Sequence, residues 1–182
     1  MVIKQCKICD LCLNNSFIPT PPIGNLNSRI MIVVDSKNKK NIAAIESAMY
    51  VAGFNDTEYY LTYLVKCRSK KPLIDYYRIK CKQWLDIEKR LPFNIVMLFG
   101  SNTYNAYFNY QPKHFYSKAI DKIIMDNNKF ILTAYSPTVT YYESKYNEFS
   151  KIFERVDTLY RDLYDANHHD NLYRLSKFQS RL

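Results

Sequence analysis

Residues 29–34 read Arg-Ile-Met-Ile-Val-Val, and residues 94–100 read Asn-Ile-Val-Met-Leu-Phe-Gly. Almost continuous apolar runs of this length are typical of strands that are buried on both faces of a parallel sheet. Two further strands are expected at residues 59–65 and 130–134. Because helix-like stretches alternate with these strands, the sequence predicts an α/β fold, a three-layer α/β/α sandwich with a central four-stranded parallel sheet.

Helical periodicity fills the intervals between the strands. Before Gly53, for example, an apolar residue recurs every three or four positions, and the glycine is suited to cap the helix. Helices are expected at residues 41–52, 75–91, 101–108 and 142–164. We therefore expect one domain over residues 1–165, with a cysteine-containing segment at its start, and a C-terminal extension over residues 166–182.

The composition predicts a soluble protein that binds a polyanion. No run of about 18 apolar residues is present, and the start lacks the basic and apolar pattern of a signal peptide, so an intracellular, cytoplasmic protein without a membrane partner is expected. Lys and Arg number 26 against 17 acidic residues, a net charge of +9, which favours nucleic acid as a partner. The abundance of Tyr, with only three Gly, indicates an A/T-rich genome, that of a phage or other virus, a mobile element or an A/T-rich bacterium.

Four cysteines form two separated clusters, with Cys6 and Cys9 near the start and Cys67 and Cys81 in the middle of the chain. In a protein without secretory features, such cysteines more often bind metal than form disulfides. Cys67 directly follows the strand expected at 59–65, so the site would tie the N-terminal segment to the body of the domain. Four cysteines suit an iron–sulfur cluster or tetrahedral zinc.

In parallel sheets of this kind, ligands bind at the carboxyl ends of the strands. The loops expected there carry a carboxylate, Asp35, together with hydroxyl and basic side chains. Because these loops share one edge of the sheet, we expect the basic and hydroxyl groups to contact phosphates. The residues expected to bind DNA are Lys37, Lys39, Lys40, Lys66, Arg68, Ser101, Ser136 and Thr138.

Several strings resemble, in order, the iron–sulfur uracil-DNA glycosylases, family four of that superfamily. They are Cys6-Lys-Ile-Cys9-Asp-Leu-Cys12, Ser28-Arg-Ile-Met-Ile-Val33, Leu64-Val-Lys-Cys67-Arg68, Val96-Met-Leu-Phe-Gly-Ser101 and Tyr135-Ser-Pro-Thr138. The resemblance spans about residues 6–163. It implies that Cys6, Cys9, Cys67 and Cys81 ligate a [4Fe–4S] cluster, with zinc as the alternative, and that Cys12 is a spare cysteine.

The catalytic motifs depart from that family. Family members carry Gly-Glu-x-Pro-Gly in the first loop, where this chain has Val34-Asp-Ser-Lys-Asn38 and thus keeps only the carboxylate of Asp35. The asparagine that reads uracil is replaced by Tyr63, which lacks the paired amide donor and acceptor. The histidine that stabilises the departing base is replaced by Ser136.

The departures predict a catalytically degenerate glycosylase-like iron–sulfur protein, a pseudoenzyme that binds DNA or a replication or repair partner. Family members also carry, after the first loop, a Phe that stacks on uracil, whereas here the helix expected from residue 41 starts almost at once. Base excision needs edge hydrogen bonds, stacking and electrostatic stabilisation, and each of those parts is altered. Two alternatives stay open: an active DNA glycosylase that excises uracil or another damaged base from a rebuilt pocket, and a protein-interaction module that does not bind DNA.

Overall fold

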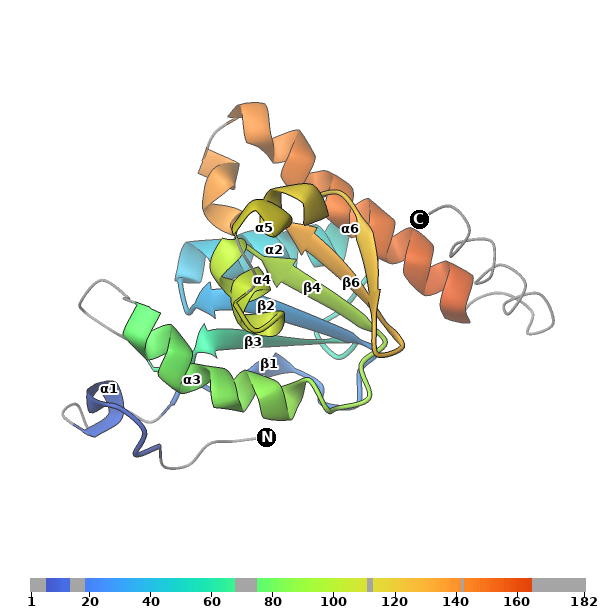
Figure 1. Cartoon of the computed structure of the whole chain (residues 1–182). Coiled ribbons are helices and arrows are strands. Elements are labelled where there is room, and N and C mark those ends of the chain that lie inside the picture. Colours follow the sequence, from blue (N-terminus) through green and yellow to red (C-terminus); the bar gives the residue numbers. More distant parts are fainter. Residues whose placement is uncertain (1–5, 14–18, 68–74, 111–112, 142, 165–182) are drawn as a thin grey trace.

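The computed structural model describes residues 6–13, 19–67, 75–110, 113–141 and 143–164. A six-stranded sheet in the order β1-β3-β2-β4-β6-β5 forms its centre (Figure 1). The strands are β1 (Ile23–Gly24), β2 (Ile30–Ser36), β3 (Tyr59–Val65), β4 (Ile95–Phe99), β5 (Ile123–Asp126) and β6 (Lys129–Ala134). The α/β class is confirmed. The extension expected at 166–182 lies outside the described residues.

The sheet is mixed, so the prediction of a four-stranded, wholly parallel sheet is wrong. The four expected strands are parallel neighbours, but β1 and β5 add an antiparallel strand at each edge. The β5–β6 hairpin turns through Asn127 and Asn128, whose φ angles are 47° and 62°. Asparagine tolerates this left-handed conformation, which a two-residue hairpin turn requires. The Asn-Asn pair was the sequence signal for β5.

Helices pack on both faces of the sheet (Figure 1). Helices α2 and α6 cover one face, while α3, α4 and α5 cover the other. The helices are α1 (Asp10–Leu13), α2 (Lys39–Val51), α3 (Asp75–Glu88), α4 (Ser101–Tyr107), α5 (Lys113–Ala119) and α6 (Glu143–Tyr164), with a 3₁₀ turn, η1, at Pro137–Tyr141. No helix in the described part of the chain is long and apolar enough to cross a membrane.

Strand β2 shows why the sheet is buried on both sides. Ile30 and Ile32 belong to the core under α2 and α6, whereas Met31 and Val33 belong to the opposite core, and all four are fully buried. Successive side chains of a strand point to opposite faces, so an uninterrupted apolar run needs cover on both. Each such side chain stabilises the fold by about 1.5–3 kcal/mol through burial.

The helix boundaries differ slightly from those expected. Helix α2 begins two residues before the expected start because the Asn38 side chain caps it, accepting hydrogen bonds from the backbone N–H groups of Lys40 and Asn41 at 3.0 and 3.3 Å. Capping by asparagine satisfies N–H groups that have no partner within the helix. The early start draws Lys39 and Lys40 out of the loop and into the first turn of α2.

Candidate functional site

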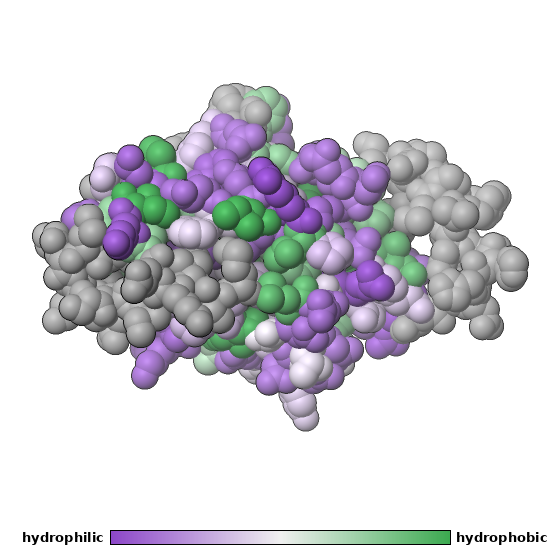
Figure 2. All heavy atoms as spheres, turned by 90° about the horizontal axis from the view of Figure 1, so that it is seen from below, coloured by the Kyte–Doolittle hydropathy of each residue, from purple (hydrophilic) through white to green (hydrophobic). Residues whose placement is uncertain are grey.

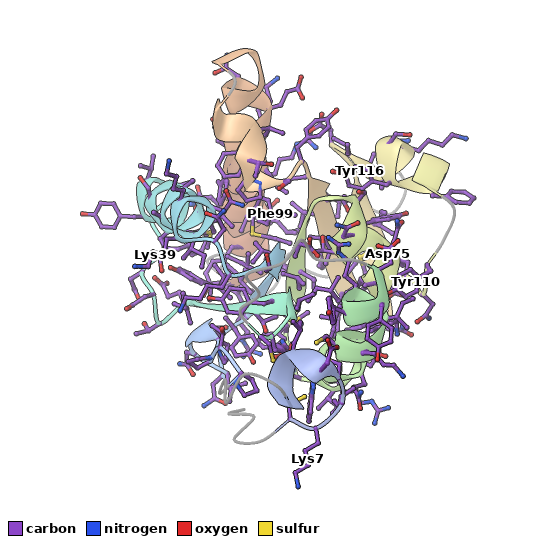
Figure 3. The ribbon with its side chains drawn as sticks, turned by 90° about the vertical axis from the view of Figure 1, so that its left-hand side faces the viewer. Lys7, Lys39, Asp75, Phe99, Tyr110 and Tyr116 are labelled. Atoms are coloured by element: carbon purple, nitrogen blue, oxygen red, sulfur yellow. The ribbon has the colours of Figure 1, made fainter. Side chains whose placement is uncertain are left out.

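The carboxyl ends of the four parallel strands share one edge of the sheet, and Figure 3 looks onto that edge. Lys39, at the start of α2, lies on one side of it, and Asp75 and Tyr110 lie on the other. The paired strand ends include Ser36 with Val65, and Phe99 with Ala134. This is the edge at which the expected site should lie.

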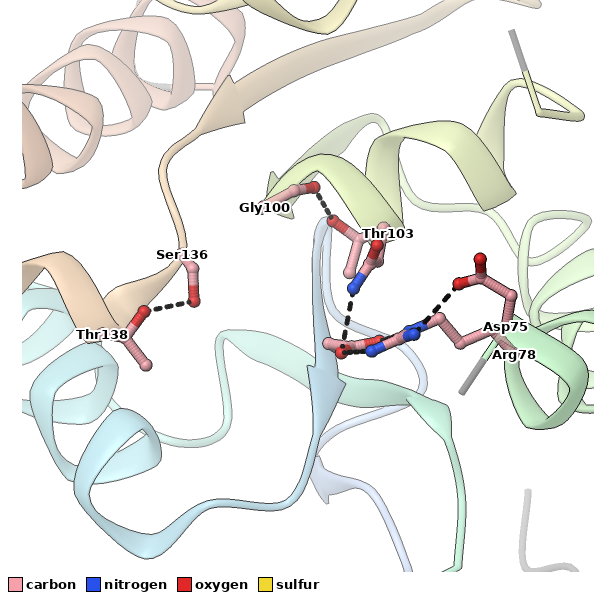
Figure 4. Close-up of polar contacts among 8 residues, drawn as sticks. Asp75, Arg78, Gly100, Thr103, Ser136 and Thr138 are labelled. Atoms are coloured by element: carbon pink, nitrogen blue, oxygen red, sulfur yellow. Dashed lines mark hydrogen bonds and ion pairs between the residues drawn. The ribbon is translucent and has the colours of Figure 1, made fainter. Parts of the chain in front are cut away.

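Asp35 is held by an arginine that the sequence did not single out. The carboxylate accepts two hydrogen bonds from the Arg78 guanidinium on α3, Nε to Oδ1 and Nη2 to Oδ2, both at 2.8 Å. The Asn102 side chain on α4 donates a third to Oδ2 at 3.2 Å, and Arg78 also pairs with Asp75 at 3.1 Å (Figure 4). Two-point pairing of this kind is among the stronger hydrogen-bonding arrangements of charged groups.

The Arg78 clamp changes what Asp35 can do chemically. A general base must present a free oxygen lone pair to the water that it activates. Here both oxygens of Asp35 face donors, and the side chains of Arg78 and Asp35 are only 14% and 30% exposed. The hydrogen bonds that Arg78 donates to Asp35 raise the pKa of Arg78, so the guanidinium stays charged. The three hydrogen bonds fill three of the about four acceptor positions of the carboxylate, and they tie β2 to α3 and α4.

Tyr63 does not face the edge of the sheet. Its side chain is fully buried in the core under α2 and α6, and its hydroxyl has no hydrogen-bond partner among the described residues. Burial, and secondarily the charge of Glu46, raises the pKa of Tyr63 to about 12. A base at the strand ends could not reach this hydroxyl. The pleat of β3 turns Tyr63 into the core, so this degenerate position lies away from the strand ends.

The hydroxyl residues of the last motif bond to one another. Thr138 donates to Ser136 Oγ at 3.0 Å, and the backbone carbonyl of Ser136 accepts from Val139 N–H at 3.0 Å (Figure 4). Ser101 begins α4 directly after Gly100, whose φ is 92° and whose position would bring a Cβ to 3.5 Å from that of Ser136. Gly100 and Ser136 are thus neighbours at the strand ends, and Ser101 and Ser136 are both partly exposed.

The basic residues divide into two groups. Lys37, Lys39 and Lys40 are exposed at the end of β2 and the start of α2. Lys66, in contrast, is 2% exposed, so its prediction as a DNA contact is wrong. Arg68 lies outside the described residues. The basic surface that the structure describes at this edge is therefore the one beside α2.

The side chain of Lys66 points into the protein, where it forms an ion pair with Glu88. Its Nζ pairs with Glu88 Oε2 at 2.6 Å and contacts Thr62 Oγ1 at 2.5 Å. Tyr60 and Thr62 each donate to Glu88 Oε1, at 2.8 and 2.9 Å. Burial lowers the pKa of Lys66, and the charge of Glu88 opposes that shift. The sequence analysis missed Glu88. Leu85 lies four residues after Cys81 on α3, and Glu88 lies three residues after Leu85, so the three side chains share one face of the helix.

The four cysteines come together from three segments. All four are buried, at 8% exposure or less, and none is in a disulfide; Cys9, Cys67 and Cys81 share one cluster with Leu11 and Val65. Helix α1 lies beside the first turns of α3, where β3 ends (Figure 1).

Cys81 is the most deeply buried of the four described cysteines, and its surroundings change the pKa of its thiol. Burial raises the pKa of Cys81 to about 11; the charges of Cys9 and Cys6 add to the shift, and a backbone hydrogen bond from Lys66 opposes it. A metal would therefore displace a proton from a neutral thiol. The donor type and burial fit a thiolate-bound metal. Over the described ranges, however, no three His, Cys, Asp or Glu side chains are spaced as ligands.

Comparison with models of known protein families and with curated protein sequences finds no match. These two comparisons therefore show no family for this chain. The described residues bury four cysteines, hold Asp35 in an ion pair and place Tyr63 in the core.

Proposed function

We propose that this protein is a catalytically degenerate uracil-DNA glycosylase-like protein that binds DNA at the carboxyl edge of its sheet. The observation that carries the proposal is the two-point ion pair between Arg78 and Asp35, at 2.8 Å for each hydrogen bond. It occupies the carboxylate that an excising enzyme would use to direct water. Degenerate motifs at Tyr63 and Ser136 agree with this assignment.

The architecture supports the same family. Parallel central strands with helices on both faces are what the three-layer glycosylase fold requires, and the two antiparallel edge strands leave that centre intact. The buried cysteines would hold the metal that the resemblance implies, a [4Fe–4S] cluster or, alternatively, zinc. When bound, such a group would supply a covalent clamp between α1, β3 and α3 rather than a reacting centre. Reduced cysteines also suit a cytoplasmic protein.

DNA binding is supported by positive charge beside the carboxyl ends of the strands. The net charge is +9, and Lys37, Lys39 and Lys40 are exposed beside the strand ends. Exposed lysines contribute point charges that position a phosphate backbone without reading its sequence. Because Lys66 is withdrawn into the core, the proposed contact is centred on the first turn of α2.

Two assays on the metal-loaded protein test the proposal. Uracil-containing single- and double-stranded DNA should yield no abasic product, whereas efficient base release would replace the pseudoenzyme with the alternative of an active glycosylase. Binding to the same oligonucleotides should weaken steeply as salt rises. Absence of binding at low salt would refute the DNA-binding assignment.

A matched pair of charge reversals locates the surface. Lys37→Glu with Lys39→Glu should weaken DNA binding about tenfold or more and flatten the salt dependence, because two phosphate contacts are lost. Lys118→Glu with Lys151→Glu makes the same change in net charge at exposed positions on α5 and α6. Equal losses for the two pairs would show that only overall charge matters and would contradict the proposed edge.

A second function, binding of a replication or repair protein, is favoured by one observation. Tyr76, Ile79 and Ile87 are 47%, 56% and 41% exposed and recur at helical spacing along the outer face of α3. The view from below in Figure 2 shows apolar residues among polar ones in the middle of that face. Ile79→Asp should abolish capture of such a partner while leaving DNA binding intact, and unchanged capture would exclude this surface.

A further inference from the structure

Tyr110, shortly after the end of α4, has a backbone conformation that is unusual for its residue type. Asn109 and Tyr110 have φ angles of 58° and 61°. Asparagine tolerates this left-handed region, but a bulky side chain seldom adopts it. The backbone N–H of Tyr110 donates to the carbonyl oxygen of Asn105, which holds the turn against α4. Because glycine would form the same turn without strain, the tyrosine side chain itself needs an explanation.

The ring of Tyr110 is open to a ligand. The residue is 42% exposed, and within the described ranges no aromatic ring or cation stacks on it. Tyr104 on α4 is, by contrast, buried, and it packs against the rings of Phe108 and Tyr116 with centroids 4.8 and 5.8 Å away. An exposed aromatic face without a partner is the kind of surface on which a nucleobase stacks.

The hydroxyl of Tyr110 points toward the start of α3. Burial raises the pKa of Tyr110, nearby carboxylates add to the shift, and the guanidinium of Arg78 opposes it. In decreasing order of effect, the carboxylates are those of Asp75, Asp86 and Asp35. Asp75 is the first residue of α3, and it acts more strongly than Asp86 near the other end of that helix. The side chain therefore reaches the carboxyl edge of the sheet, beside the ion pair between Arg78 and Asp35.

The two sides of this edge differ in charge. Lys37 and Lys39 are exposed on one side, whereas Tyr110 lies on the other side with Asp75, whose side chain is 82% exposed (Figure 3). Lysines attract a phosphate and a carboxylate repels it, but a base is uncharged. A DNA strand at this edge would therefore keep its phosphates near the lysines and turn a base toward Tyr110.

We propose that Tyr110 is a stacking platform for an unpaired base of single-stranded DNA. This inference rests on the proposed DNA-binding function and adds the form of DNA that the edge prefers. Inside a duplex, neighbouring base pairs already cover both faces of each base, so a base must leave the stack before it can cover the ring. The protein should therefore bind a single strand more tightly than a duplex of the same sequence.

Fluorescence anisotropy with labelled single-stranded and duplex oligonucleotides, at one salt concentration, tests the inference. Tyr110→Gly removes the ring and keeps the turn, because glycine adopts this φ without strain. It should weaken binding of the single strand about tenfold, as the loss of one stacked base typically does, and change duplex binding by less than about twofold. Tyr110→Phe and Tyr110→Trp keep an aromatic face and should bind like the wild type.

Two controls separate stacking from other effects. Tyr50 is 78% exposed near the end of α2, and Tyr50→Ala should change neither affinity. An oligonucleotide with the same phosphates but abasic sugars offers no base to stack. The wild type and Tyr110→Gly should therefore bind this oligonucleotide equally well.

The possible failures are distinguishable. If the wild type binds the single strand and Tyr110→Gly binds it equally tightly, the stacking inference is wrong and DNA binding stands. Equal losses for single strand and duplex, or a Tyr110→Phe protein as weak as Tyr110→Gly, would also show that the ring does not stack on a base. If the wild type binds neither DNA at low salt, the proposed function itself is refuted, and stacking with it.

Discussion

At the scale of the residue, Tyr63 shows how one buried hydroxyl affects stability. Its ring is fully buried, and in the described part of the chain its hydroxyl has no hydrogen-bond partner. A buried polar group without a partner loses its hydration without compensation, at a cost of about 1–3 kcal/mol. Burial of the ring therefore stabilises the folded state, whereas burial of the unpaired hydroxyl destabilises it.

Replacing Tyr63 with Phe should raise the free energy of unfolding at pH 7 by about 1 kcal/mol, because the same ring is kept and the unpaired hydroxyl is removed. Urea denaturation measures the change. A destabilised Tyr63→Phe protein would show that the hydroxyl has a partner after all.

The same substitution predicts a pH dependence. Since the pKa of Tyr63 is raised from 10.0 to about 12, the folded state holds this proton more tightly than the unfolded state. Its contribution to stability is complete below pH 10 and is lost as the pH rises from 10 to 12. The advantage of Tyr63→Phe over wild type should therefore widen in alkaline solution; an advantage that stays constant from pH 8 to pH 11 would contradict the shift.

At the scale of the element, α3 is joined to the end of β3 by the buried pair of Glu88 and Lys66, the residue directly after that strand. The two side chains are 3% and 2% exposed, with Nζ and Oε2 2.6 Å apart. Removing one member of a buried pair leaves a desolvated charge, and this typically costs about 3–5 kcal/mol.

Lys66→Met should therefore destabilise the protein strongly, by about 3 kcal/mol or more. Adding Glu88→Gln should restore most of that loss, because glutamine is neutral and still accepts hydrogen bonds from Tyr60 and Thr62. A double-mutant cycle in urea measures the coupling. If the double variant were less stable than Lys66→Met alone, the charge of Glu88 would not be the cause of the loss.

Strand β1 depends on a glycine. Gly24 has φ of 87°, and a Cβ there would lie 2.0 Å from the backbone oxygen of Tyr59 and 2.8 Å from that of Asp56. Gly53 has a similar φ of 90° but no atom within 4 Å of such a Cβ. A side chain at Gly53 would meet backbone strain alone, whereas one at Gly24 would meet both backbone strain and steric overlap.

Gly53→Ala should lower the free energy of unfolding by about 1 kcal/mol, which is the cost of a positive φ for a residue other than glycine. Gly24→Ala should cost several times as much, because the β1–β3 pairing must also move apart. Thermal unfolding of the two variants measures the difference. Equal losses would mean that β1 can shift without disturbing β3.

At the scale of the whole molecule, the cysteines join segments that are far apart in the sequence. Cys6 and Cys9 lie more than fifty residues from Cys67, yet all are buried in one region. A metal bound only by the folded state stabilises that state by mass action and restricts the N-terminal segment.

Removing bound iron or zinc should therefore lower the melting temperature of the entire domain, not only loosen α1. Cys9→Ser should reproduce the loss, whereas Cys12→Ser should not, since the family resemblance leaves Cys12 outside the ligand set. Metal content and calorimetry on the same samples measure both effects. Equal metal content in the Cys9→Ser and wild-type proteins would refute the ligand assignment.

Much of the architecture could be predicted from local pattern. The apolar run at 30–34 and the periodicity before Gly53 depend on neighbouring residues alone, so four strands and four helices were found close to their observed positions. The edge strands were missed because β1 is two residues long and β5 shows only intermediate burial. Short, half-exposed strands carry little apolar signal and are defined by the strand with which they pair.

The sequence by itself determined that this is an α/β chain with a basic surface and two pairs of cysteines, because composition and periodicity are local properties. Only the tertiary structure decided that Arg78 from α3 reaches Asp35 on β2 and that Lys66 turns inward to Glu88. These partners lie 43 and 22 residues apart, and which side chains meet across such separations depends on how the helices pack against the sheet.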